Sequence, residues 1–307
     1  MEELLKRELG TSRLEPYGFG GGGCISSGQG YVTDTGRIFA KHNSKSEARR
    51  MFDGEYASLE AIDKTETIRA PKPIKVIDQP SGGAVLVAEY VDIKSLSKYA
   101  SQLGEQLAQM HLYNDEVGKR LSLQESSVHK DESLEYVSRF GFPVTTCCGY
   151  LPQDNTWQDD WVVFFTRQKL QQQLDLIEKE YGDREARELW PQLLRKIPDF
   201  FKGIDIKPAL LHGDLWGGNL GECDTGPVIF DPACFYGHHE YELGIMMMFG
   251  GSGSQTLTPY HKLIPKSPRF EERHKLYQLF HYLNHWNHFG GSYRHQSIGI
   301  MRSLIKK

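Results

Sequence analysis

The chain has 307 residues and a formal net charge of −4 at pH 7, with hydrophobic and charged fractions of 39% and 25%. These values are typical of a globular enzyme with one large or two smaller domains, and the weak acidity argues against a nucleic-acid or anionic-membrane partner. No apolar stretch reaches the length of about 18 residues that a membrane helix needs. Residues 1–9 mix acidic and basic side chains, unlike a signal peptide. We therefore expect a cytoplasmic protein with no membrane partner.

Cysteine usage supports this expectation. The number of cysteines is odd, and no two of them form a Cys-x-x-Cys pair; they are Cys24, Cys147, Cys148, Cys223 and Cys234. This pattern argues against a disulfide framework or a structural zinc site, and it favours reduced thiols.

The first ninety residues predict a small β-rich lobe. A helix is expected over residues 1–9 and a glycine-dense loop over residues 16–30. A hairpin of residues 31–33 and 37–41, a helix over 46–64, and a second hairpin of 74–77 and 84–90 follow in that order. We therefore place a nucleotide-binding lobe at residues 1–91.

The remainder is predicted to be mostly helical. Long apolar periodicities predict helices over residues 96–113, 164–181, 183–197 and 271–288. Residues 121–135 are polar and weakly periodic, which predicts a mobile loop with short helical pieces. The fold class is therefore α+β, with two lobes, and residues 92–307 form the larger catalytic and substrate lobe.

The most informative segment runs from His212 to Asn219 and continues at the apolar strand that ends in Asp231. Phosphoryl transfer needs a carboxylate to receive or orient the proton of the acceptor hydroxyl, and Asp214 suits this role. It also needs oxygen ligands for Mg²⁺, which Asn219 and Asp231 can supply. A lone His-Gly-Asp is usually only a tight turn, but the flanking apolar runs favour the catalytic interpretation.

The nucleotide side is predicted from Gly22, Gly23 and Cys24, which lie in the glycine-dense loop, and from Lys41. Glycines let backbone N–H groups approach phosphates, although this loop matches neither standard phosphate-binding pattern. Lys41 follows Ala40 on a strand, as in the Val-Ala-Ile-Lys signature of kinases. Glu55, on the next helix, is the expected partner of Lys41, and Glu47 at the helix start is the weaker candidate.

The segment Glu89-Tyr90-Val91 connects the two lobes. A connecting segment exposes backbone groups that a purine edge can use. We assign the Glu89 carbonyl and the Val91 amide to adenine.

Taken together, these motifs make the chain resemble the fructosamine-3-kinase or ketosamine-3-kinase family, and within it the vertebrate fructosamine-3-kinase-related branch. The resemblance runs essentially end to end and is carried by residues 1–5, 22–26, 144–149, 157–161, 210–219, 230–233 and 282–289. The Cys-Cys-Gly block at 147–149 and the Asn-His-Trp-Asn-His block at 284–288 are not generic kinase features.

The resemblance implies a protein-kinase-like fold of the aminoglycoside phosphotransferase type. It implies ATP-dependent, Mg²⁺-assisted phosphorylation of O3′ in ketosamines on protein lysines or free amines. Ribulosamines and psicosamines are the favoured substrates that the resemblance implies, and fructosamines are a further candidate substrate. The 3-phosphate would then eliminate and release the amine. By motif, Asp214 is the proton acceptor, Lys41 binds phosphate, residues 89–91 bind adenine, and Asn219 and Asp231 bind the metal. Cys234 departs from the small hydroxyl residue expected after Asp-Pro-Ala.

Two clusters have more than one interpretation. His281, His285 and His288 fall on one helix face, where metal binding competes with a structural or substrate role. We expect Trp216 and His285 to contact the substrate, against the alternative of plain packing. Cys24 is either inert or a redox switch, so the protein is expected to be a monomer, or a dimer linked through Cys24.

Other function classes stay open. A related small-molecule kinase would act on an aminoglycoside-type or choline-type acceptor. A pseudokinase would bind nucleotide without turnover, but the presence of Lys41, Asp214, Asn219 and Asp231 disfavours it. Protein-kinase activity is disfavoured because no Ala-Pro-Glu follows residues 231–233.

Overall fold

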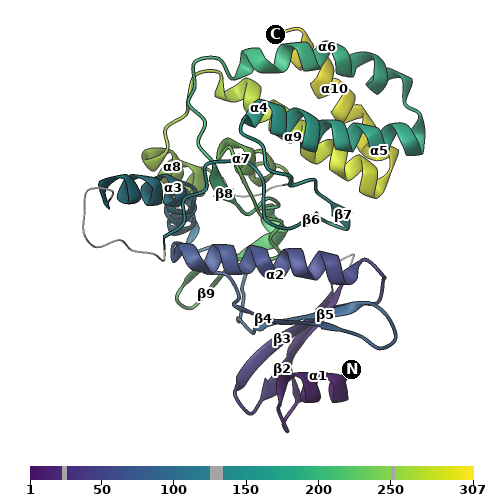
Figure 1. Ribbon diagram of the computed structural model, residues 1–307, viewed down its shortest axis with the longest axis vertical. Helices are drawn as coiled ribbons and strands as arrows, with labels where there is room; N and C mark the ends of the chain where they lie inside the picture. Colours follow the sequence, from purple (N-terminus) through teal and green to yellow (C-terminus); the bar gives the residue numbers. More distant parts are fainter. Residues whose placement is uncertain (23–25, 125–133, 250–252) are drawn as a thin grey trace.

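The structure is a computed structural model that describes residues 1–22, 26–124, 134–249 and 253–307. A sheet-based lobe and a helical lobe lie one above the other, with the N-terminus at the far end of the first and the C-terminus at the far end of the second (Figure 1). The predicted bilobal α+β architecture is confirmed. The boundary expected at residue 91 falls between the last strand of the sheet and the next helix, and the division into two domains stays a prediction.

The sheet lobe contains five antiparallel strands in the order β1-β2-β3-β5-β4. Their bounds are β1 Glu15–Gly22, β2 Ser27–Thr33, β3 Gly36–Asn43, β4 Pro73–Asp78 and β5 Ala84–Glu89. The hairpin between β2 and β3 turns at Gly36, whose φ of 141° favours glycine. Both predicted hairpins are therefore present.

One expectation for this lobe was wrong. Residues 16–30 were predicted as a glycine-dense loop, yet Glu15–Gly22 form an edge strand that pairs with β2, and β2 itself begins at Ser27. Glycine weakens a strand locally, and only the partner strand supplies the hydrogen bonds that compensate. The register shifts between Tyr17 and Gly21, as expected where glycines interrupt regular pairing.

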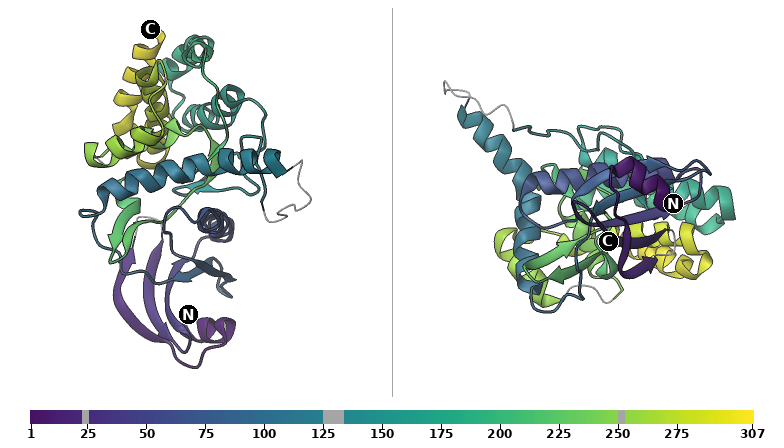
Figure 2. Two further views of the ribbon diagram at one scale, coloured as in Figure 1. Left: turned by 90° about the vertical axis from the view of Figure 1, so that its left-hand side faces the viewer. Right: turned by 90° about the horizontal axis from the view of Figure 1, so that it is seen from below.

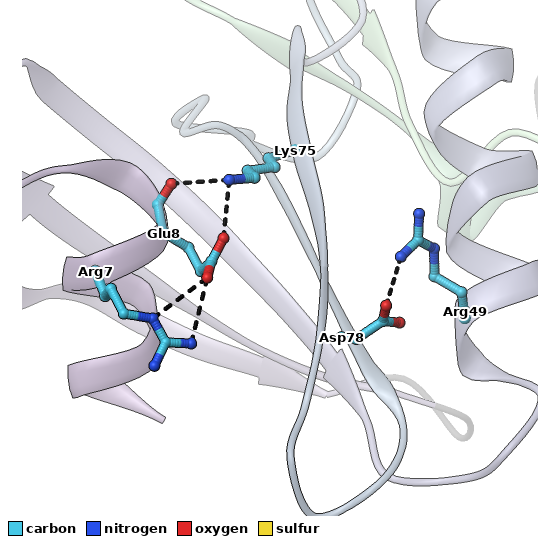
Figure 3. A network of polar contacts seen from close by, with 5 residues as sticks. All are labelled: Arg7, Glu8, Arg49, Lys75 and Asp78. Carbon is cyan, nitrogen blue, oxygen red and sulfur yellow. Dashed lines mark hydrogen bonds and ion pairs between the residues drawn. The ribbon is translucent and has the colours of Figure 1, made fainter.

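Two helices flank the sheet. Helix α1 (Glu2–Leu9) and helix α2 (Ala48–Thr65) are both tied to β4 by ion pairs. Lys75 Nζ lies 2.9 Å from Glu8 Oε2, and Arg49 Nη1 lies 2.8 Å from Asp78 Oδ2, as Figure 3 shows. Helix α2 lies between the sheet and the helical lobe (Figure 1). It can therefore present side chains to both lobes.

The helical lobe begins with α3 (Ala100–Gln124), which runs across the junction beside α2 (Figure 2). The described helical elements that follow are α4 Trp161–Val163, η1 Phe164–Gln171, α5 Gln172–Tyr181, α6 Arg184–Phe200, η2 Gly217–Asn219, α7 Glu240–Met246, α8 Ser254–Leu263, α9 Phe270–Phe289, η3 Gly291–Tyr293 and α10 Arg294–Ile305. The four long helices predicted from periodicity are present, but α3 spans residues 100–124 where 96–113 were predicted. Element η1 is a π-helix that continues into α5, and the π geometry was not predicted.

Three short two-stranded sheets carry the connections of this lobe. They pair β6 Cys147–Cys148 with β7 Leu151–Pro152, β8 Ala209–Leu211 with β11 Phe235–Gly237, and β9 Leu220–Cys223 with β10 Gly226–Ile229. Strands β8 and β10 are fully buried, so the loops that follow them are anchored in the core. Within the described ranges, no helix combines the length and apolarity needed to cross a bilayer.

Candidate active site

Strand β8 delivers the segment His212-Gly213-Asp214 to the junction of the lobes. Gly213 has a φ of 86°, and a Cβ at this position would lie 2.2 Å from the carbonyl oxygen of Ala233. Both facts require glycine. The loop after β8 is therefore pressed against the loop that follows Asp231, and this brings the two predicted catalytic segments together.

Glu242 holds the backbone of this loop, a role that the sequence did not reveal. Its buried carboxylate, on α7, accepts hydrogen bonds from the backbone N–H groups of His212 and Gly213, the latter at 3.1 Å. A carboxylate beside the apolar run of residues 243–248 was the available signal, because buried carboxylates need partners. The His212 ring is also anchored, with Nε2 2.9 Å from the carbonyl oxygen of Phe230.

Asp214 lies beside Asn219 and close to two other carboxylates. Asn219 Nδ2 donates to the Asp214 carbonyl oxygen at 2.9 Å. Burial, and then the negative charges of Glu242 and Asp231, raises the pKa of the Asp214 carboxyl to about 7. The structure therefore brings Asp214 and Asn219 together, as their spacing predicted.

Asp231 completes the cluster from the end of β10. Its φ of 56° is unusual for a residue with a side chain, and its carboxylate is half-exposed, at 46%. Such local strain often accompanies functional positions. The preceding residue is fixed by the Phe230 N–H, which donates to the Asn219 carbonyl oxygen at 3.0 Å.

Lys41 joins the two lobes. Its Nζ lies 2.9 Å from Glu55 Oε2 on α2 and 3.0 Å from Asp231 Oδ1. Burial opposes the charge of Lys41, but the two carboxylates outweigh burial and raise its pKa above the ordinary value. The predicted pair of Lys41 with Glu55 is present, whereas Glu47 is the half-buried N-cap of α2. The additional contact with Asp231 was not predicted.

The predicted adenine segment lies at the end of β5. The Glu89 side chain pairs with Arg69 at 2.6 Å, and the Tyr90 N–H donates to the Arg37 carbonyl oxygen at 3.3 Å. Neither contact involves the Glu89 carbonyl or the Val91 amide, so the adenine assignment stays a prediction. Gly22 pairs with Ser27 at the end of β1, while Gly23 and Cys24 lie outside the described residues.

Trp216 and His285 occupy different surroundings. The Trp216 side chain is 40% exposed and its ring lies against Gly218. The backbone N–H of Trp216 donates to the Asp214 carbonyl oxygen at 3.1 Å. His285, on α9, lies among the rings of Phe249, Phe289 and Tyr293, at centroid distances of 4.9, 5.6 and 5.1 Å. Trp216 is thus attached to the predicted catalytic loop of residues 212–219, and His285 belongs to an aromatic cluster.

The metal interpretation of the α9 histidines has no support among the described residues. His281 is completely buried against Tyr241 and Phe280, and the only close ligand group found in the described ranges is His238, His239 and Glu240. In that group the Glu240 carboxylate already pairs with Arg273, at 2.7 and 2.8 Å. Asn219 and Asp231 fit Mg²⁺ better. The Asn219 Nδ2 is engaged, so its Oδ1 is the atom available to a cation, and Asp231 offers a half-exposed carboxylate.

Comparison with known proteins places this chain in a family. A profile of the fructosamine kinase family matches residues 2–307. The chain is also 59% identical to the ketosamine-3-kinase of Mus musculus, over 100% of both chains. The chain belongs to the fructosamine kinase family. This confirms the resemblance that the motifs indicated.

More distant matches show how far the fructosamine kinase fold extends. A chloroplastic protein-ribulosamine 3-kinase of Oryza sativa subsp. indica is 38% identical, over 93% of this chain and 78% of that protein. A crystal structure from Haemophilus somnus, named as a fructosamine-3-kinase, has a TM-score of 0.77 at 20% identity, over 98% and 95% of the two chains. Aminoglycoside phosphotransferase APH(4)-Ia, in a ternary complex with ADP and hygromycin B, has a TM-score of 0.56 at 14% identity, over 100% and 98%. The predicted aminoglycoside phosphotransferase-like fold is confirmed.

Proposed function

We propose that this protein is an ATP-dependent ketosamine 3-kinase that phosphorylates O3′ of ribulosamine and psicosamine adducts on protein lysines and small amines. The observation that carries the proposal is the convergence of Lys41, Asp214, Asn219 and Asp231 at the junction of the lobes. Family membership supports the acceptor, because relatives of the chain are named for ketosamines and ribulosamines.

Each residue then has a chemical role. Asp214 receives the proton of the O3′ hydroxyl as the oxygen attacks the γ-phosphorus of ATP, and ADP leaves. Asn219 and Asp231 would hold Mg²⁺, which neutralises phosphate charge when bound. Lys41, oriented by Glu55, would bind the α- and β-phosphates, with Gly22, Gly23 and Cys24 beside them. Residues 89–91 would bind adenine.

The acceptor side is assigned to Trp216 and His285. Trp216 presents an exposed aromatic ring from the catalytic loop itself, and an aromatic face suits a sugar ring or a protonated amine. We assign His285, which lies in the aromatic cluster on α9, to the substrate as well. The 3-phosphate of a ketosamine would eliminate and release the amine, so the reaction is a deglycation step in the cytoplasm.

The test compares substrates and variants in one assay. We expect ATP consumption with ribulose-lysine and psicose-lysine, less with fructose-lysine, and none by Asp214→Asn. Trp216→Ala should raise KM for the ketosamine about tenfold, by loss of roughly 1–2 kcal/mol of ring contact, and leave KM for ATP unchanged. Tyr181→Ala, which removes another exposed aromatic ring, is the matched control.

The outcomes separate the alternatives. Turnover of an aminoglycoside or choline in place of ketosamines would move the protein to a related kinase class. Nucleotide binding without turnover of any acceptor would indicate a pseudokinase. Equal KM values for wild type and Trp216→Ala would remove Trp216 from the substrate site.

A further inference from the structure

Lys169 is a buried lysine whose amine has no carboxylate within ion-pair distance among the described residues. It lies in η1, is 0% exposed, and its Nζ sits 4.2 Å from the centre of the Phe235 ring. Its hydrogen bonds go to two neutral amides, Gln153 Oε1 at 3.1 Å and Asn155 Oδ1 at 2.9 Å. Burying an amine in this way costs free energy, so its contacts call for an explanation.

Lys169 binds the side-chain oxygen atoms of Gln153 and Asn155, so their NH₂ groups point away from Lys169. Gln153 Nε2 donates to the Ala233 carbonyl oxygen at 3.2 Å and to Thr146 Oγ1 at 3.1 Å. Asn155 Nδ2 donates to Thr146 Oγ1 at 2.8 Å. In a side-chain amide the oxygen accepts and the NH₂ group donates. The hydrogen bonds from Lys169 to the two oxygens therefore direct the NH₂ groups toward Thr146 and Ala233.

This network reaches the segment that follows Asp231. The Thr146 hydroxyl donates to the Cys234 carbonyl oxygen at 3.1 Å, and the Cys234 N–H donates to Ser58 Oγ on α2 at 3.0 Å. The Ala233 N–H donates to the His212 carbonyl oxygen at 2.8 Å. Residues 233 and 234 are therefore held from α2, from the catalytic loop, and from the amides that Lys169 orients.

We propose that Lys169 is a positioning residue for phosphoryl transfer, which fixes the segment behind Asp231 through Gln153, Asn155 and Thr146. The proposal rests on the metal role of Asp231 in the proposed function. The carbonyl groups that the network holds belong to Ala233 and Cys234, two and three positions after Asp231, and Gly213 packs directly against the first of them. A displacement of that segment therefore moves Asp231 relative to Asp214.

The protonation state of Lys169 does not alter this role. Burial lowers the pKa of Lys169 to about 7, with Asp154 and Cys148 opposing the shift. A neutral amine still donates two hydrogens, enough for Gln153 and Asn155. The network therefore needs the donors of the side chain and not its charge.

The experiment compares Lys169→Met with Lys179→Met, which replaces an exposed lysine on the adjoining α5. Hydrogen exchange of the ligand-free protein should show at least roughly tenfold faster exchange at the Ala233 and Cys234 amides in Lys169→Met only. The kcat with the ketosamine and saturating ATP should fall roughly 10- to 100-fold, because misplacement by about 1 Å has effects of this size.

A second variant, Thr146→Val, keeps the proposal testable if Lys169→Met does not fold. It replaces with a methyl group the hydroxyl that bonds Cys234, Gln153 and Asn155. It should show the same local increase in exchange. Unchanged exchange at residues 233 and 234 in a folded Lys169→Met or Thr146→Val protein would overturn the proposal. The exchange measurement needs no substrate, so failure of the proposed function, seen as a wild type that turns over no ketosamine, is distinguishable from failure of this inference.

Discussion

Two glutamates on α7, two positions apart, serve different parts of the molecule. Glu242 accepts from the backbone of His212 and Gly213, and Glu240 forms a buried ion pair with Arg273. Hydrogen bonds to a charged acceptor are stronger than those between neutral groups. The first glutamate therefore shapes the catalytic loop, and the second fixes α7 to α9.

We predict that Glu242→Gln lowers kcat about tenfold or more. The glutamine side chain can still accept a hydrogen bond, but it lacks the charge that orients the N–H groups of His212 and Gly213. The expected loss of transition-state stabilisation is about 2 kcal/mol. Glu240→Gln is the matched control. It should lower the melting temperature, since Arg273 stays buried without its counter-charge, and leave kcat of the folded fraction unchanged. Steady-state kinetics and thermal unfolding of both variants check this, and an unaltered kcat in Glu242→Gln would refute it.

Helix α9 is an element whose histidines couple stability to pH. Burial, and then the neighbouring His285, lowers the pKa of His281 well below its ordinary value, and burial also lowers the pKa of His274, His285 and His288. In the unfolded chain these groups titrate near pKa 6.5. Below that pH these histidines become protonated in the unfolded state but stay neutral in the folded state. The free energy of unfolding therefore falls as pH falls.

We therefore predict that His281→Leu loses less stability than wild type between about pH 7 and pH 5. The difference should approach 2 kcal/mol, from about 1.4 kcal/mol per pH unit below about pH 6.5. Chemical denaturation at several pH values measures it. His295→Leu, which removes an exposed histidine of α10, should keep the slope of wild type. A parallel slope for His281→Leu would contradict the buried, neutral state of His281.

Across the whole molecule, Lys41 and Asp231 form a contact between the lobes. Lys41 comes from the sheet, Asp231 from the end of β10, and Glu55 from the helix between the lobes. A nucleotide with its metal would bind to groups from both lobes at once. Ligand binding should therefore stabilise the molecule as a whole.

We predict that Mg²⁺ with a non-hydrolysable ATP analogue, at about 100 times its Kd, raises the free energy of unfolding by about 2.7 kcal/mol. Removal of the metal with EDTA should abolish most of this gain, and Asp231→Asn should lose the metal-dependent part. Asp224→Asn, an exposed carboxylate in the turn between β9 and β10, is the control and should respond like wild type. Equal stabilisation with and without Mg²⁺ would argue against the metal site.

Sequence reasoning was most successful where the information is local. The helical and strand periods, the turn at Gly36, and the spacing of Asp214, Asn219 and Asp231 all lie within short segments. It failed for β1, whose glycines read as loop, because the partner strand that satisfies the backbone of β1 cannot be seen in the segment itself. It missed Glu242 and Lys169 because their partners lie elsewhere in the chain.

The sequence by itself therefore determined the fold class, the family and the identity of the phosphotransferase motif, since each depends on residue types at fixed short spacings. Only the tertiary structure decided that Lys41 contacts both Glu55 and Asp231. It also decided that Glu242 accepts hydrogen bonds from the backbone of the catalytic loop and that His285 lies among aromatic rings. The physical reason is that a buried polar group must find a partner wherever packing places one, and packing is a property of the folded chain.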